Sequence, residues 1–383
     1  MSVSDLADPR AWPSRAGDEG APYDAVRQAI EAPTAADADA FDARARRWLE
    51  GLLAAGNADV LSDVLAHAPS PAIARHLRRL LADVEQGAPA SSTELRTTLF
   101  AIPVVLVAAL DAGATEVVLD AVLPDAAALS AMQREARAFG GSETFALSSS
   151  LVAADAIDVR ALPALLARRA LAQRDDELAF AALDLAPAPI RVEPGLERVH
   201  LRFIPGVILT PPHADPLAAS AIGGWGMAFA NAIAKALDAP GVSLLALPRP
   251  AQGFVGAVQS GRAAQREVSA QIFTSNAIRK FRASLGEPTA IVSAHRAPDA
   301  PGGGELRLSL SSPFAPKAAE GFRCPLYPYE TVQDVGAMLD ALLRDCRVAD
   351  VRFIPGVHPD IDPVTRAPLF FKDHGGSPEV PLH

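Results

Sequence analysis

Hydrophobic and polar positions follow two different periods along the chain. Over residues 23–87 the apolar side chains recur at helical spacing, as at Leu49, Leu52 and Leu53, which places them on one face of an amphipathic helix. After this region, short β-branched or alternating runs interchange with helical ones. The pattern predicts a helical module over residues 23–87, preceded by a flexible arm over residues 1–22 and followed by a mixed α+β region.

The second region contains the elements of two similar halves. Strands are predicted at residues 97–107, 143–149, 198–204, 242–247, 289–295, 305–311 and 351–354. Helices are predicted at residues 125–139, 158–173, 253–285 and 331–346. We therefore expect two related ferredoxin-like halves of order β-α-β-β-α-β, over residues 95–210 and 241–357, and a C-terminal tail over residues 358–383.

A repeated hexapeptide supports an internal duplication. The sequence RFIPGV occurs at residues 202–207 and again at residues 352–357. The alternative is that two unrelated strands converged on the same favourable turn, since Pro-Gly is a common turn pair. If each pair forms a turn at a strand end, Gly206 and Gly356 both need positive φ.

Composition and charge exclude several classes of protein. The net charge is −10 and no dense stripe of Lys and Arg stands out, so we expect no nucleic-acid partner. The two cysteines, Cys324 and Cys346, have no CxxC spacing, which argues against a disulfide framework or a zinc ribbon. The N-terminus lacks the pattern of a signal peptide, and no apolar run is long enough to span a bilayer, so we expect a cytoplasmic protein with no membrane partner.

The best candidates for a chemical site follow the two hexapeptides. His213 and Asp215 come after the first copy, and His358, Asp360 and Asp362 come after the second. Side chains at i and i+2 of an extended segment share a face, so these groups could hold a divalent metal, or a carboxylate could orient a histidine that acts as a general base. The alternative is that they are ordinary turn residues that bond to nearby backbone groups.

Three further positions have a functional and a structural interpretation. His295 and Arg296 end a predicted strand, where α/β folds often place ligand groups, but a solvated strand end fits them as well. Cys324 is a candidate nucleophile only if a histidine lies near it, and is otherwise a structural cysteine. Tyr327 and Tyr329 form either an exposed aromatic patch or part of the core.

Short motifs give the chain a family resemblance. They are residues 48–57 (WLEGLLAAGN), the strand end Ile102-Pro103, residues 342–348 and residues 367–370 (APLF). In these the chain resembles a conserved family of bacterial proteins of unknown function. The resemblance implies a paired-cysteine turn before the last motif, where this chain has PVTR instead, and it implies no activity.

Two hypotheses for function remain. The first is a non-enzymatic cytosolic binding, regulatory or scaffold protein with no cofactor, which binds a protein partner or a second copy of itself rather than a small molecule. The missing catalytic motifs favour it. The second is a metal-assisted hydrolase or transferase, with a divalent metal at the His-x-Asp positions that follow the hexapeptides. Convergence of those residues in space would favour the second hypothesis.

Overall fold

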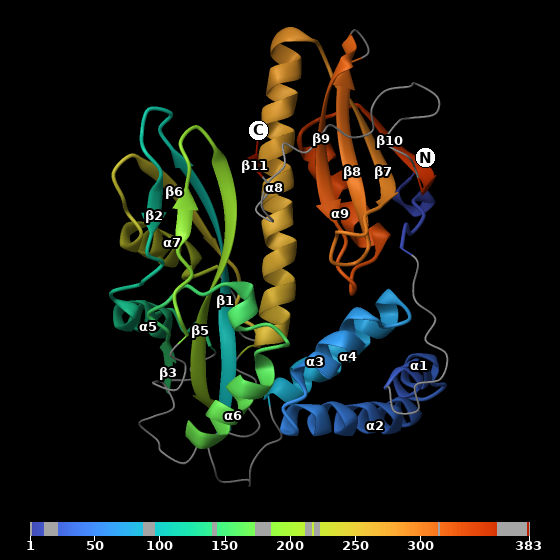
Figure 1. The fold of residues 1–383 in the computed structure, drawn as a ribbon, viewed down its shortest axis with the longest axis vertical. Helices are drawn as coiled ribbons and strands as arrows, with labels where there is room; N and C mark the ends of the chain where they lie inside the picture. The colour runs from blue at the N-terminus through green and yellow to red at the C-terminus, as the bar shows by residue number, and fades with distance from the viewer. Residues whose placement is uncertain are drawn as a thin grey trace. The chain divides into compact units, whose positions relative to one another are not determined.

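The chain forms two compact units, each of which combines helices and sheets (Figure 1). The computed structural model describes residues 2–10, 22–86, 96–139, 144–172, 185–210, 217, 223–312, 315–357 and 381–382. Unit 1 comprises residues 1–20, 65–75 and 266–383, and unit 2 comprises residues 21–64 and 76–265. In the ranges that the structure describes, no helix is both long and apolar enough to cross a membrane.

The first four helices lie within residues 23–87, the range of the predicted helical module. They are α1 (Tyr23–Glu31), α2 (Ala35–Ala54), α3 (Ala58–Ala66) and α4 (Pro71–Gln86). Thr34 begins α2 as its N-cap, because its side chain accepts a hydrogen bond from the backbone N–H of Asp37 at 3.2 Å. Helices α1 and α2 pack together, and each has a buried face that includes Val26 of α1 or Leu49 of α2.

Unit 2 is built on a long antiparallel ladder. Strand β1 (Arg96–Leu110) lies between β5 (Glu197–Thr210) and β6 (Val242–Pro248) and is antiparallel to both. The remaining elements of this unit before α8 are β2 (Val117–Leu119), α5 (Ala126–Glu135), β3 (Thr144–Leu147), η2 (Ala154–Ala156), α6 (Leu162–Ala172), β4 (Ile190–Val192) and α7 (Gly226–Ala236). Strand β3 pairs with β5, and β2 pairs with β4.

Helix α8 (Phe254–Ser284) begins in unit 2, and its first turn is held by a buried carboxylate. Glu85 is fully buried and accepts hydrogen bonds from the backbone N–H groups of Phe254 and of Val255, the latter at 3.1 Å. The first N–H groups of a helix have no partner within it and carry partial positive charge, so a carboxylate is stabilising there. Glu85 therefore joins the helical module to α8.

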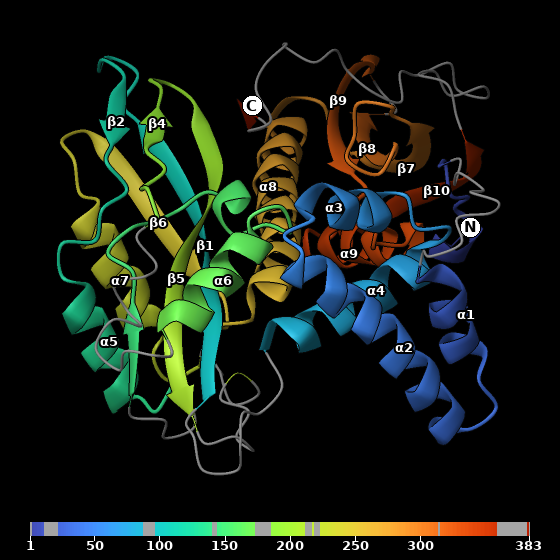
Figure 2. The ribbon, with the colours of Figure 1, turned by 60° about the horizontal axis from the view of Figure 1, so that its bottom comes forward.

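Unit 1 contains a four-stranded sheet with order β10-β7-β8-β9. The elements of unit 1 outside α3, α4 and α8 are η1 (Val3–Asp5), β7 (Thr289–Arg296), β8 (Gly304–Ser312), β9 (Ala315–Pro325), α9 (Val332–Asp345), β10 (Asp350–Val357) and β11 (Pro381–Leu382). Strands β7, β8 and β9 are antiparallel neighbours, and β10 returns parallel to β7 after the chain has crossed the sheet through α9 (Figure 2). A parallel return requires such a crossover.

The two faces of the unit 1 sheet differ in polarity. On one face Leu306, Leu308 and Leu310 are fully buried, and Phe322 stacks on Phe273 of α8 with ring centroids 5.3 Å apart. The alternate positions of the same strands are polar, because successive side chains of a strand point to opposite faces. They include Ser293, His295, Glu305, Arg307 and Ser309, all of which are also buried.

The structure confirms a mixed α+β fold with antiparallel sheets but does not confirm two ferredoxin-like copies. The hexapeptides lie in β5 and β10, which are paired differently: β5 is antiparallel to β1, whereas β10 is parallel to β7. Strand β6, which the sequence analysis places at the start of the second half, pairs with β1. Strand β9 is an additional element that the sequence analysis does not predict.

The two Pro-Gly pairs have different geometries. Gly356 has a φ of 92°, as predicted for a turn, and lies where the register between β10 and β7 shifts. Gly206 does not have positive φ, so that part of the prediction is wrong: β5 continues through it to Thr210. Glycine is needed there for another reason, since a Cβ at Gly206 would lie 2.3 Å from Cζ of Phe100.

We therefore predict that Gly206→Ala destabilises the protein by about 1–3 kcal/mol, because the new methyl group displaces a fully buried phenyl ring. Gly51→Ala is the matched control. Gly51 lies within α2 with open space at its Cβ position, so its substitution should be neutral or stabilising. Urea denaturation followed by circular dichroism measures both. Equal midpoints for the two variants would contradict the prediction.

Candidate functional site

The residues that follow the hexapeptides lie outside the part of the chain that the structure describes. This applies to His213 and Asp215 after the first copy and to His358, Asp360 and Asp362 after the second. Their predicted convergence is therefore untested, and the metal-assisted hypothesis stays a prediction. Among the described residues, no group of three or more His, Cys, Asp or Glu side chains is placed to hold a metal ion.

His295 and Arg296 end strand β7 as predicted, but they have different environments. Arg296 is exposed, whereas His295 is 2% exposed and its Nε2 lies 2.7 Å from Oγ of the buried Ser293. A hydroxyl beside an imidazole is the arrangement that activates a serine nucleophile. Here both groups are in the interior of unit 1, and a substrate would need access to Ser293, which is fully buried.

Glu305 is the cross-strand neighbour of His295 and is bound by two guanidinium groups. Arg307 donates from Nε to its Oε1 at 2.5 Å, and Arg323 donates from Nε to its Oε2 at 2.6 Å. Such charge-assisted bonds satisfy a carboxylate that is 1% exposed. The polar row around His295 therefore has the properties of a buried structural network.

A more distinctive feature of unit 1 is the way residues 2–10 bind to its sheet and to α9. From here on, the arm means residues 2–10 alone. The sequence analysis assigns them to a flexible segment, but Leu6, Pro9 and Arg10 are buried while Ser2 and Ser4 are exposed. The buried side chains therefore face the body of unit 1, whereas Ser2 and Ser4 face solvent. Residues 3–5 form the short helix η1, and the residues after it contribute the buried side chains, as the anchor residues of a bound peptide do.

Two glycines form the floor beneath the arm. A Cβ at Gly336 of α9 would lie 2.8 Å from Cγ1 of Val3 and 2.9 Å from Cδ1 of Leu6. A Cβ at Gly304 of β8 would lie 2.7 Å from Cγ of Pro9. The absence of side chains at both glycines lets the arm approach α9 and β8 closely.

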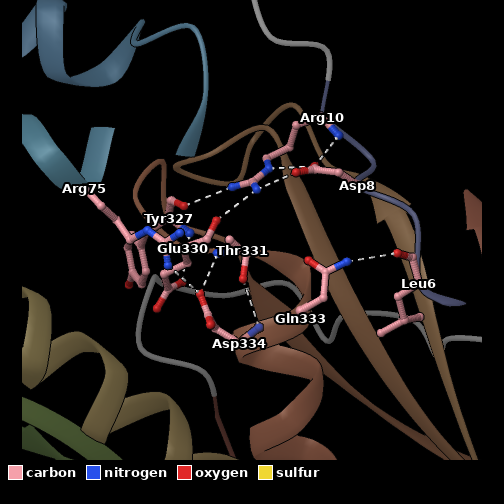
Figure 3. Close-up of polar contacts among 9 residues, drawn as sticks. All are labelled: Leu6, Asp8, Arg10, Arg75, Tyr327, Glu330, Thr331, Gln333 and Asp334. Carbon is pink, nitrogen blue, oxygen red and sulfur yellow. Dashed lines mark hydrogen bonds and ion pairs between the residues drawn. The ribbon is translucent and has the colours of Figure 1, made fainter. Parts of the chain in front are cut away.

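The backbone of the arm is also held. Leu6 forms a parallel β-bridge with Gly356 of β10. Its carbonyl oxygen accepts a hydrogen bond from Nε2 of Gln333 at 3.4 Å (Figure 3). The partners of Leu6 thus come from two elements, α9 and β10. We call the surface formed by Gly304, Gly336 and Gly356, with the loop from β9 to α9, the arm groove.

Arg10 has the most specific contacts of the arm (Figure 3). Its guanidinium donates from Nη1 to the carbonyl oxygen of Tyr327 at 3.0 Å and from Nη2 to that of Glu330 at 2.9 Å. Asp8 accepts from Nε at 2.8 Å and from Nη2 at 2.7 Å. The side chain of Arg10 is only 2% exposed, so these bonds compensate the charge for its loss of water.

The loop that accepts Arg10 is fixed from its other side by Arg266 of α8. The carboxylate of Glu330 forms a bidentate pair with Arg266, with both N···O distances at 2.7 Å, and accepts from the backbone N–H of Tyr327 at 3.1 Å. Although burial alone would lower the pKa of Arg266, its hydrogen bonds to Glu330 raise it, so the guanidinium stays charged. Tyr327 stacks on the buried Tyr329, which places this pair in the structural framework rather than in an exposed patch.

The start of α9 completes the surroundings of the groove (Figure 3). Thr331 and Asp334 form a capping box, in which each side chain accepts from the backbone N–H of the other. The same carboxylate lies 3.3 Å from Nη1 of Arg75. These contacts fix the loop end next to the residues that accept Arg10.

Comparison with known proteins does not identify the chain. No family model, curated protein or solved structure matches it. The resemblance to a bacterial family of unknown function therefore stays a prediction, and the site is interpreted from its geometry.

Sequence reasoning misses the arm groove, although one signal for it exists. Val3, Leu6 and Pro9 are apolar residues at intervals of three within a polar segment. The segment is too short and too polar to predict a helix or a strand, so its sequence is typical of a loose terminus. The hydrogen-bond partners of Arg10 lie 317 and 320 positions away, which a pattern search along the chain does not detect.

Cys324 lies beside this loop, in surroundings that disfavour a nucleophilic thiolate. Burial raises the pKa of its thiol to about 12, and the charge of Arg266 only partly offsets this effect. The thiolate is the reactive form, so almost none is present near neutral pH. The structural interpretation of Cys324 is therefore the one that its environment supports. Cys346, at the end of α9, is half-buried.

We predict that iodoacetamide labels Cys346 but not Cys324 when the native protein is treated at pH 8. Cys324 is fully buried and remains a thiol at that pH, whereas Cys346 is partly accessible. Mass spectrometry should show one modification in the native state and two after denaturation. A Cys346→Ser variant that is still labelled while folded would contradict this assignment.

Proposed function

We propose that the chain is a non-enzymatic binding protein and that unit 1 binds a short linear segment of a protein in the arm groove. The observation that carries the proposal is the arm itself, which occupies this surface as a ligand does. It contributes buried apolar side chains, a main-chain bridge and a buried arginine. Peptide-binding domains use the same three kinds of contact.

The hydrogen bonds that join the arm to the rest of unit 1 are long-range ones, as those of a ligand are. The hydrogen bonds from Arg10 to Tyr327 and Glu330 join residues 317 and 320 positions apart, and that from Gln333 to Leu6 joins residues 327 apart. The chain resumes after the arm in α1, which belongs to unit 2. The arm thus contacts unit 1 through groups that a separate peptide could equally supply.

Other features predicted from the sequence also remain proposals. An acidic chain with two cysteines outside any CxxC pair is consistent with a role in the cytoplasm. The recurrence of RFIPGV in β5 and β10 is the support for an internal duplication. A homodimer is one form of the protein partner that the sequence analysis expects.

The proposal is tested by supplying the arm as a separate peptide. Leu6→Asp and Arg10→Ala together should release the arm of the full-length chain, because they remove its main apolar and polar anchors. A fluorescent peptide of residues 2–10, acetylated and amidated, should then bind saturably to this variant, as measured by fluorescence anisotropy. The unsubstituted chain, whose groove is occupied, should bind it at least tenfold more weakly.

Gly336→Leu provides the control for the location of binding. Leucine is a better helix former than glycine, so α9 should remain intact, while its side chain occupies the space that Val3 and Leu6 need. Added to the arm-released variant, it should abolish peptide binding. If proteolysis shows that the arm is free and the peptide still does not bind, the proposed function is wrong.

A further inference from the structure

The contacts of Arg10 indicate which class of partner the arm groove accepts. Resting on the function proposed above, we infer that the groove selects a protein segment with an Asp-x-Arg sequence that follows an apolar anchor. Such a segment of another protein binds by displacing the arm. Arg10 is the specificity-determining residue of the arm, and the loop from Tyr327 to Glu330 is the part of the groove that recognises it.

Two separate acceptors require a guanidinium. The carbonyl oxygens of Tyr327 and Glu330 accept from different nitrogens of Arg10, Nη1 and Nη2, at 3.0 and 2.9 Å. A guanidinium presents these donors in a fixed, planar arrangement, whereas a lysine presents one nitrogen on a flexible stem. Lysine at this position leaves at least one buried carbonyl without its charged donor.

The aspartate of the ligand supplies the counter-charge. Asp8 accepts from Nε and Nη2 of Arg10 and also from its backbone N–H at 3.0 Å. The nearest acidic side chain of the loop, Glu330, is bound to Arg266 through both carboxylate oxygens. The groove therefore presents neutral carbonyl groups to Arg10, and the ligand brings its own carboxylate to neutralise the buried charge.

The other contacts fix the spacing of the segment. Leu6 lies over Gly336, and Pro9 lies over Gly304 between the aspartate and the arginine. Proline has a restricted φ, so it reduces the number of conformations that the Asp-x-Arg sequence loses on binding. The preferred ligand thus has an apolar residue two positions before the aspartate and proline or another compact residue between aspartate and arginine.

The arm also sets a threshold for competing ligands. A tethered segment has a high effective concentration at its own site, so an external peptide must bind more tightly or be present in excess to replace it. A ligand that lacks the arginine does not compete, because it lacks the contacts to Tyr327 and Glu330. The arm therefore excludes weak, non-cognate segments from the groove.

The inference is tested with four peptides of residues 2–10 on the arm-released, full-length chain: the native sequence, Arg10→Lys, Asp8→Asn and Ser4→Ala. We expect the lysine and asparagine peptides to bind at least roughly tenfold more weakly, since each loses a charge-assisted contact that is at least partly shielded from water. The Ser4→Ala peptide should bind like the native one, because Ser4 is exposed in the arm. Competition against the unsubstituted chain should follow the same order.

The outcomes separate this inference from the proposed function. If the native and lysine peptides bind equally well, and binding is lost with Gly336→Leu, the groove binds segments without selecting arginine and the inference is wrong. If the asparagine peptide binds as well as the native one, the role of Asp8 as counter-charge is wrong. If none of the four peptides binds, the proposed function itself fails.

Discussion

A guanidinium that leaves water must find acceptors for its N–H groups, and the arrangement of one end of unit 1 follows from this requirement. Arg10 is buried against two carbonyl oxygens of the loop between β9 and α9. That loop can hold its shape because Arg266 binds the carboxylate of Glu330 from the other side. Two buried arginines therefore fix one loop, one from the body of the unit and one from the arm.

Polar groups elsewhere in the two units are buried under the same constraint. Glu85 is compensated by the first N–H groups of α8, and Glu305 by Arg307 and Arg323. These contacts position helices and strands. The arm differs from them because a short segment, residues 2–10, contacts elements that lie almost 300 or more positions away in the sequence. For this reason we interpret the arm groove, and not the row around His295, as the functional surface.

The sequence predicts the local elements better than their assembly. The periods of apolar residues place helices such as α9 and strands such as β8, because these depend on neighbouring positions. Pairing is set by contacts between distant strands, so the placement of β6 beside β1 and the role of Gly206 under Phe100 are not visible in the pattern. The candidate site is missed for the same reason, since a single arginine in a polar terminus carries no periodic signal.

The most direct test of the account is thiol labelling along the arm. Leu6→Cys and Ser4→Cys, each in a Cys346→Ser background, place one thiol at a buried position of the arm and one at an exposed position. In the native protein iodoacetamide should label the Ser4→Cys variant quickly and the Leu6→Cys variant much more slowly, and Arg10→Ala should remove the protection of the Leu6→Cys thiol. Equal labelling rates of the two native variants would show that the arm does not occupy the groove, and the account would be wrong.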